Sequence, residues 1–138
     1  YKNSSAFKLY LVDSGLLRTK LRLSPLTILK GDKLFTEFKG VLTENYVLQA
    51  LIRQFGNDIF YWTSGNQAEI EFMLDLNNRI IPIEVKSSMS IKSRSLSEYR
   101  KKNIPELSVR LSLKNLEKNG DLVNLPLYLA DYFSLLII

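Results

Sequence analysis

Two apolar segments joined at Asn77-Asn78 constrain the fold of this chain more than any other feature. The segments, residues 68–76 and 79–87, alternate apolar and polar residues, which is typical of strands that place one face against a core. Consecutive asparagines tolerate the left-handed backbone conformation that a tight turn between antiparallel strands requires. The sequence therefore predicts a β-hairpin with its turn at these two asparagines.

Alternation along the two arms separates apolar from charged side chains. The apolar residues predicted to share one face are Ile70, Phe72, Leu74, Ile81, Ile83 and Val85. The charged residues predicted on the other face are Glu69, Glu71, Glu84 and Lys86. Pairing about the turn sets position 71 across from position 84, so we expect a compact cluster of acids and one lysine with apolar packing behind it.

Upstream of the hairpin, the spacing of apolar residues predicts a long helix from about Leu34 to Phe55. The apolar positions predicted to share its face are Leu34, Phe38, Val41, Leu48, Ile52 and Phe55. Gly56-Asn57 is typical of a helix end. Glu44 falls inside the apolar stripe, where a carboxylate is costly unless it is paired or metal-bound. If this helix packs on the charged face of the hairpin, Glu44 joins the cluster.

The rest of the chain completes an α/β pattern. Strands are expected at 7–13, 58–63 and 107–113, short helical turns and loop at 16–32, and helices at 92–103 and 125–138, with Pro126 in the first turn of the last one. Asp13-Ser14-Gly15 is predicted to end the first strand and Ser64-Gly65-Asn66 to form a turn. The order of helix, three strands, helix and strand predicts one α/β domain, residues 1–138, with a mixed central sheet flanked by helices.

Composition limits the chemistry. The chain has no cysteine and no histidine, which excludes disulfides, thiolate metal sites and imidazole as a general base. A metal ion would need oxygen ligands, which favours Mg²⁺, Mn²⁺ or Ca²⁺. Lys and Arg exceed Asp and Glu by 19 to 14, and this net charge of +5 is compatible with a polyanionic partner.

The apolar runs are too short to span a bilayer and no signal-peptide pattern is present, so we expect a cytoplasmic protein without a membrane partner. Because the first residue is Tyr1 rather than Met, we also expect this sequence to be a piece of a longer protein. It contains no G-x-x-x-x-G-K-[ST] motif, so an ATP-hydrolysing module of that type would lie outside it.

Glu44, Glu71 and the triplet Glu84-Val85-Lys86, on the predicted order of elements, resemble the PD-(D/E)xK nuclease superfamily. More narrowly, the chain resembles the C-terminal domain that follows the ATP-binding module in many bacterial and archaeal AAA+-type ATPases. The stretches that carry this narrower likeness are FKLYLVDSGLL, GVLTENYVLQAL, IFYWTSGNQAEIEFML, IIPIEVKSS and NLPLYLADYF.

This resemblance implies a restriction-endonuclease-like core and metal-dependent hydrolysis of nucleic-acid phosphodiesters, with DNA and an ATPase module of the same chain as partners. It implies that Glu44, Glu71 and Glu84 are catalytic and bind Mg²⁺ or Mn²⁺, and that Lys86 assists the attacking water. Glu71 stands where the superfamily usually has Asp. The extra methylene displaces the carboxylate, and a shift of about 1 Å can cost roughly two decades in rate.

Two further interpretations stay open. The hairpin charges are equally typical of the solvated face of an amphipathic strand, and a nuclease scaffold without catalysis would serve as a DNA- or protein-binding module that regulates the ATPase. The basic residues predicted to contact phosphates are Lys92, Arg94, Arg100, Lys101 and Lys102. They also fit a solvated helix face.

Overall fold

A mixed α/β architecture is confirmed by the computed structural model, which describes residues 7–30, 33–65, 68–90 and 92–137. The helices are α1 (Ser14–Lys20), α2 (Pro25–Lys30), α3 (Lys33–Phe55), α4 (Arg94–Asn103), the 3-10 helix η1 (Leu127–Tyr132) and α5 (Phe133–Ile137). The strands are β1 (Ile59–Thr63), β2 (Glu69–Leu76), β3 (Arg79–Val85), β4 (Ser108–Ser112), β5 (Glu117–Asn119) and β6 (Leu122–Pro126).

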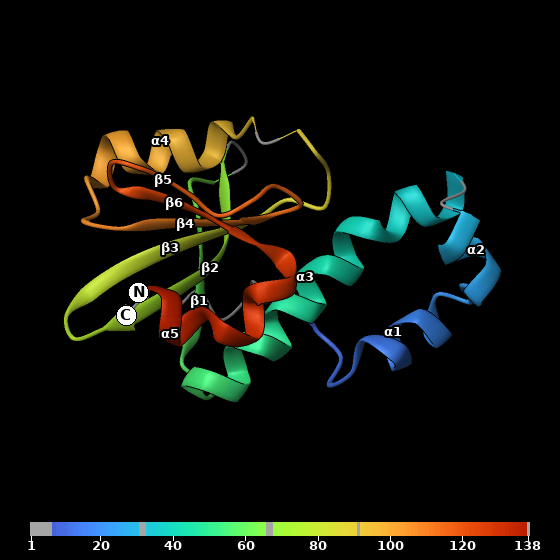
Figure 1. Ribbon diagram of the computed structural model, residues 1–138. Helices are drawn as coiled ribbons and strands as arrows, with labels where there is room; N and C mark the ends of the chain where they lie inside the picture. The colour runs from blue at the N-terminus through green and yellow to red at the C-terminus, as the bar shows by residue number, and fades with distance from the viewer. Residues whose placement is uncertain (1–6, 31–32, 66–67, 91, 138) are drawn as a thin grey trace.

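Within these described ranges the strands form one six-stranded sheet in the order β1-β2-β3-β4-β6-β5. The central pairs β3–β4 and β4–β6 are parallel, and the outer pairs are antiparallel. Figure 1 shows α4 over one face of the sheet, and α3 with α5 against the opposite face. The parallel centre is therefore covered on both sides, as such strands require.

The hairpin formed by β2 and β3 is confirmed. Its register pairs Leu76 with Arg79 at the turn and continues to Phe72 with Ile83. Asn77 and Asn78 both have positive φ, 54° and 63°, which is the conformation of a two-residue hairpin turn. Local turn chemistry thus sets the register of the strands that carry the acids.

A β-bulge changes which side chains of β2 share a face. β1 pairs Phe60 with Met73 and Trp62 with Ile70, so Glu71 and Phe72 together stand opposite the single residue between Phe60 and Trp62. After this extra residue the alternation shifts phase. Phe72 belongs to the core cluster on the α3 side, whereas Ile70 packs with the cluster beneath α4. The prediction that Ile70 shares a face with Phe72 and Leu74 is wrong for this reason.

Helix α3 confirms the predicted long helix, and Gly56 (φ 76°) follows its last residue. From residue 38 onward, its buried residues are Asn45, Val47, Ala50 and Leu51, whereas Val41 is 49% exposed. The side chain of Leu34 lies outside the described residues. Val47, Ala50 and Leu51 pack on the apolar side chains of β2 and β3. The condition for Glu44 to join the cluster, packing of this helix on the charged face of the hairpin, is therefore not met: the helix covers the apolar face.

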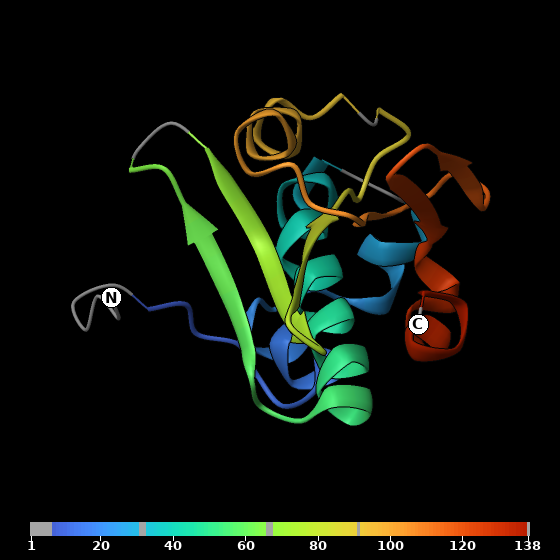
Figure 2. The same cartoon turned by 90° about the vertical axis from the view of Figure 1, so that its left-hand side faces the viewer.

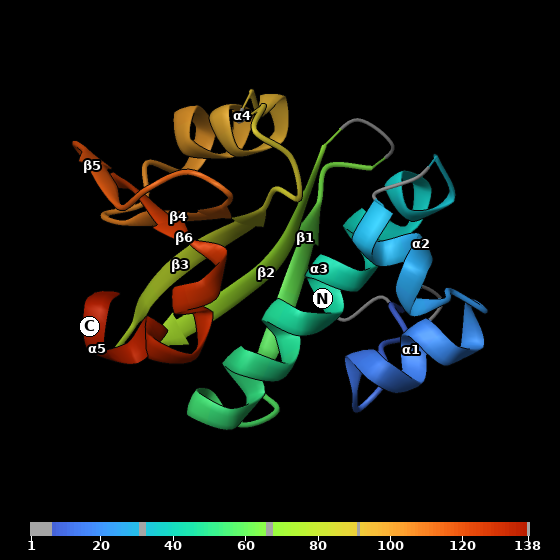
Figure 3. The ribbon, with the colours of Figure 1, turned by 45° about the vertical axis from the view of Figure 1, so that its right-hand side comes forward.

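Residues 7–13 are not a strand, because no strand in the described part of the chain pairs with them. Instead α3 holds Leu11: its N–H donates to Asn45 Oδ1 (2.9 Å), and its carbonyl accepts from Gln49 Nε2 (2.9 Å). Asp13 does not end a strand but caps α1, since its side chain accepts the N–H of Leu16. Figure 2 shows this dark-blue segment running past β1 toward α1, and Figure 3 shows α1 and α2 beside α3, beyond the β1 edge.

The end of the chain differs from the single helix predicted there. Its first part is the buried strand β6, where Pro126 is the last residue, followed by η1 and α5. A short apolar run does not distinguish a buried strand from a helix, which explains the error. Among the described residues no helix combines the length and apolarity needed to cross a membrane.

Candidate functional site

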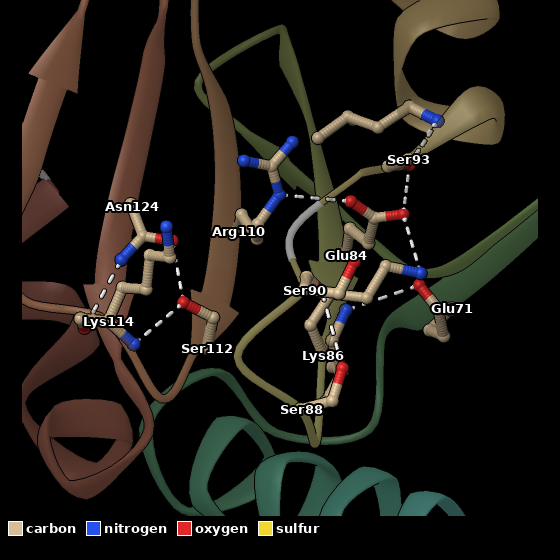
Figure 4. Close-up of polar contacts among 12 residues, drawn as sticks. Glu71, Glu84, Lys86, Ser88, Ser90, Ser93, Arg110, Ser112, Lys114 and Asn124 are labelled. Atoms are coloured by element: carbon tan, nitrogen blue, oxygen red, sulfur yellow. Dashed lines mark hydrogen bonds and ion pairs between the residues drawn. The ribbon is translucent and has the colours of Figure 1, made fainter.

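The candidate site lies where β2 and β3 part. Beyond the pair Phe72–Ile83 the two strands no longer pair, and Glu71 Oε2 accepts the backbone N–H of Val85 at 3.2 Å. The N–H of the next residue, Lys86, points to the other side and donates to Leu111 of β4 at 2.8 Å. The carboxylate of Glu71 therefore lies between the two strands, in the place of a strand neighbour (Figure 4).

Burial dominates the electrostatics of Glu71. It raises the pKa of the Glu71 carboxyl from 4.5 to about 7, and the nearby charges of Glu84 and Glu44 act in the same direction. The hydrogen bond from Val85 opposes the shift. Near neutral pH this acid is thus divided between its protonated and ionised forms.

Glu84 is the most enclosed acid of the site, with 1% of its surface exposed. It lies opposite Arg110 in the parallel β3–β4 register, and Arg110 Nε donates to Glu84 Oε2 at 3.2 Å. Lys86 Nζ lies 3.2 Å from Glu84 Oε1. A buried carboxylate needs such partners because desolvation of an unpaired charge is costly. Two cationic side chains, Arg110 and Lys86, therefore contact the buried carboxylate of Glu84.

Ser93 connects Glu84 to helix α4. The Ser93 hydroxyl donates to Glu84 Oε1, and its oxygen accepts the N–H of Leu96 at 3.1 Å as the N-cap of α4. Figure 4 shows Glu84 between Ser93 on one side and Arg110 on the other. The start of α4 is thus fixed to an acid of the candidate site.

Glu44 approaches the site from α3. The Tyr10 hydroxyl donates to Glu44 Oε2 at 3.5 Å, and the Tyr10 ring packs on Phe72 with 5.8 Å between centroids. Burial, followed by the charge of Glu44, raises the pKa of Tyr10, which stays a donor. Glu44 also contributes to the raised pKa of Glu71. It is an electrostatic neighbour of Glu71 on the side of the sheet opposite α4.

The structure brings Glu71, Glu84 and Lys86 together and sets Glu44 within electrostatic range of Glu71. In the part of the chain that the structure describes, no three acidic side chains form a group that could hold a metal ion. Three-carboxylate ligation is thus not formed in this arrangement, and the catalytic and metal-binding roles of these residues stay predictions. Glu69, the third acid predicted on the charged face of the hairpin, instead forms an ion pair with Lys8.

The five predicted phosphate-contacting residues lie on and before α4. Arg94 pairs with Glu98 and Arg100 with Asp121, so these two guanidinium groups already have acidic partners. The remaining three are Lys92, Lys101 and Lys102, which are exposed and form no ion pair within the described residues. Within the described residues, the positive charges of this region that have no acidic partner therefore belong to lysines.

Two surface hollows are not lined by Glu44, Glu71 or Glu84. One of about 340 Å³ lies at the β2–β3 turn and is lined by Arg79, Tyr99 and Glu106, among others. The other, of about 480 Å³, is lined by Met89 and by residues that follow β4, including Lys114. Met89 is in the loop after Lys86, so the second hollow is the one that adjoins the candidate site along the chain.

Sequence reasoning missed three contributors to the site: Arg110, Ser93 and Tyr10. Arg110 had a local signal, because Ser108, Arg110 and Ser112 form the polar alternation of a strand that is buried along its whole length. Ser93 is the N-cap type of residue expected before a helix. Tyr10 had no signal beyond its place in an apolar segment, since its contact with Glu44 joins residues 34 positions apart.

Comparison with known proteins gives one match. No curated protein and no solved structure matches this chain. Residues 39–129, about two thirds of the 138 residues, match a family described as a domain of unknown function, DUF4143. The match runs from α3 into η1 and includes Glu44, Glu71, Glu84 and Lys86. The chain therefore belongs to the DUF4143 family.

Proposed function

We propose that this domain is a metal-dependent, nuclease-like module with a restriction-endonuclease-like PD-(D/E)xK core, and that it hydrolyses nucleic-acid phosphodiesters. The observation that supports this most is the position of Glu71. Its carboxylate binds the backbone of β3 at Val85, between the acid Glu84 and the lysine Lys86. Two carboxylates and one ammonium group thus meet where the strands part.

The donor set fits Mg²⁺ or Mn²⁺ held by two protein carboxylates. Mg²⁺ in proteins is commonly bound by one or two carboxylates, with water and substrate phosphate completing its shell. Glu71 and Glu84 would be these ligands, since a carboxylate that already accepts hydrogen bonds has further lone pairs. Glu44 would act from a greater distance, through its charge. When bound, the ion would polarise the phosphodiester and make water a better nucleophile.

The side chains of this protein would then perform three tasks. Lys86, held 3.2 Å from Glu84, would orient the attacking water and stabilise the negative charge that develops on the phosphate. Glu71, whose pKa is about 7 without a metal ion, would give up its proton and become a ligand when the ion binds. Glu84, which is buried and contacts Lys86, would hold the ammonium group of that lysine in place.

We propose DNA as the substrate and an ATPase module of the same chain as the partner. The exposed lysines Lys92, Lys101 and Lys102 and the net charge of +5 support a polyanionic substrate. The ATPase partner rests on the sequence resemblance described above.

The test is nicking of supercoiled plasmid with Mn²⁺ by the wild-type domain, by Lys86→Ala and by Lys118→Ala. Lys118 is an exposed lysine on β5 and serves as the matched control. We expect nicking by the wild type and by Lys118→Ala, and its loss in Lys86→Ala. Equal nicking by all three would indicate a contaminating nuclease and would contradict the proposal. A fourth variant, Glu71→Asp, restores the acid typical of the superfamily and should nick faster.

A second function has one specific observation in its favour. Glu84 already has Arg110 on one oxygen and Lys86 on the other, so the site is neutralised without a metal ion. A domain with this arrangement would bind DNA or protein and regulate its ATPase partner without cutting. Titration with Mn²⁺ separates the two functions: DNA binding without uptake of Mn²⁺ at millimolar concentration favours the second.

A further inference from the structure

Arg110 has unused hydrogen-bonding capacity beside the acid site. Its guanidinium carries five N–H donors, and the Nε donor is taken by Glu84 at 3.2 Å. Among the described residues the Nη nitrogens of Arg110 have no acceptor. Figure 4 shows these two nitrogens turned away from Glu84. Four donors of a side chain next to the candidate site are therefore available to a ligand.

Those donors are still reachable from solvent. Arg110 is 9% exposed, and in the described part of the chain the one buried side-chain polar atom without a partner is Ser108 Oγ, not a nitrogen of Arg110. A guanidinium in this state is fixed at one edge and open at the other. It has lost most of its hydration, so a ligand that binds it displaces little water.

The residues on the neighbouring strands fix the direction in which the guanidinium group of Arg110 points. β3, β4 and β6 set Glu84, Arg110 and Asn124 in one row, because Glu84 pairs with Arg110 and Arg110 with Asn124. Asn124 is itself committed: its side chain binds Ser112 and the carbonyl of Asn115. Arg110 therefore has a fixed acid on one flank and a satisfied amide on the other, and neither competes for its Nη donors.

From this geometry we propose that Arg110 is a phosphate-binding residue. Its two Nη nitrogens donate to a phosphate of the nucleic-acid backbone that neighbours the phosphate to be cleaved. Planar, forked guanidinium groups match the oxygens of a phosphate, and the Nε bond to Glu84 holds the fork in place. This inference rests on the proposed nucleic-acid substrate and deepens it, because it names the residue that would position the substrate over Glu84.

The test separates binding from cleavage. Affinity for a short fluorescent single-stranded DNA is measured in EDTA, at several salt concentrations, so that no hydrolysis occurs. Removal of Arg110 alone would leave Glu84 with one partner fewer, so the comparison uses a Glu84→Gln background. Glu84→Gln is compared with Glu84→Gln/Arg110→Met, and the control is Glu84→Gln/Arg53→Met. Arg53 is an exposed arginine of α3 that pairs with Asp131.

We expect Glu84→Gln/Arg110→Met to bind the DNA about tenfold more weakly than Glu84→Gln. The slope of log affinity against log salt concentration should be shallower by the amount that corresponds to about one phosphate contact. The Arg53 control should bind like Glu84→Gln. Circular dichroism and thermal melting confirm that each variant is folded. Equal affinity and equal salt dependence in all three would overturn the inference and leave Arg110 as a partner of Glu84 only.

The outcome for Arg110 is distinct from the outcome for the nuclease proposal. Binding that depends on Arg110 in the Glu84→Gln background, together with a wild-type domain that never nicks DNA, would support the phosphate site and contradict catalysis. Nicking by the wild type, together with binding that does not depend on Arg110, would support catalysis and contradict the phosphate site.

Discussion

The carboxylate of Glu71 accepts the backbone N–H of Val85, with 3.2 Å between Oε2 and N. A side chain thus replaces a strand neighbour at the point where β2 and β3 part. Since Val85 lies between Glu84 and Lys86 in the chain, this one bond fixes the distance of Glu71 from both. The bulge in β2, which lets two residues stand where one is expected, allows Glu71 to reach this place.

The first prediction concerns stability as a function of pH. Glu71 keeps its proton in the folded state up to about pH 7, whereas an ordinary glutamate loses it near 4.5. The contribution of Glu71 to the free energy of unfolding is therefore most favourable below pH 4.5, and it is lost as the pH rises to about 7. Glu71→Gln keeps an oxygen for Val85 and has no proton to lose. We expect it to be more stable than the wild type above neutral pH, by at most roughly 3 kcal/mol.

Urea unfolding of the wild type and Glu71→Gln at about pH 5 and about pH 8 checks this expectation. Asp75→Asn serves as the control, because Asp75 is an exposed acid on the same strand. A difference between Glu71→Gln and the wild type that stays constant between the two pH values would contradict a raised pKa of Glu71 in the folded protein.

The second prediction concerns Mn²⁺. A metal ion that uses Glu71 as a ligand must displace the proton that the carboxyl holds below its pKa of about 7. Affinity for Mn²⁺ should therefore rise with pH through the neutral range, and calorimetry should detect proton release. In Glu71→Gln the affinity should be lower and this pH dependence should be absent. Tight binding with the same pH dependence in Glu71→Gln would exclude Glu71 as a ligand.

Much of the hairpin and α3 follows from local sequence. Asn77-Asn78 sets the turn, apolar spacing predicts the helix, and the register from Leu76–Arg79 to Phe72–Ile83 is the one that this turn predicts. The alternation of apolar and polar residues within β2 does not show how β2 pairs with β1. The bulge, and the face of the sheet on which Ile70 lies, therefore could not be predicted from it. The pairing of Glu84 with Arg110 depends on parallel contacts between strands that α4 separates in the chain. Such contacts need the tertiary fold.

The third prediction concerns the extended segment before α1. Asn45 is fully buried, with 0% of its surface exposed, and its side chain accepts the N–H of Leu11. Asn45→Ala removes this acceptor, and we expect a loss of about 1–3 kcal/mol in stability and faster hydrogen exchange at the Leu11 amide. Hydrogen-exchange mass spectrometry measures both the local and the global effect. Asn119→Ala, in the exposed strand β5, should change neither.

The last prediction concerns Ser93, which serves α4 and Glu84 at the same time. Ser93→Ala removes the N-cap and one donor to Glu84, so we expect a loss of about 2 kcal/mol in urea unfolding. Ser93→Thr keeps a hydroxyl for both bonds and should recover most of it. Ser93→Asp separates the two roles, because a carboxylate caps a helix well but repels Glu84. If the role of Ser93 were confined to the cap, Ser93→Asp would be as stable as the wild type; we expect it to be at least as unstable as Ser93→Ala.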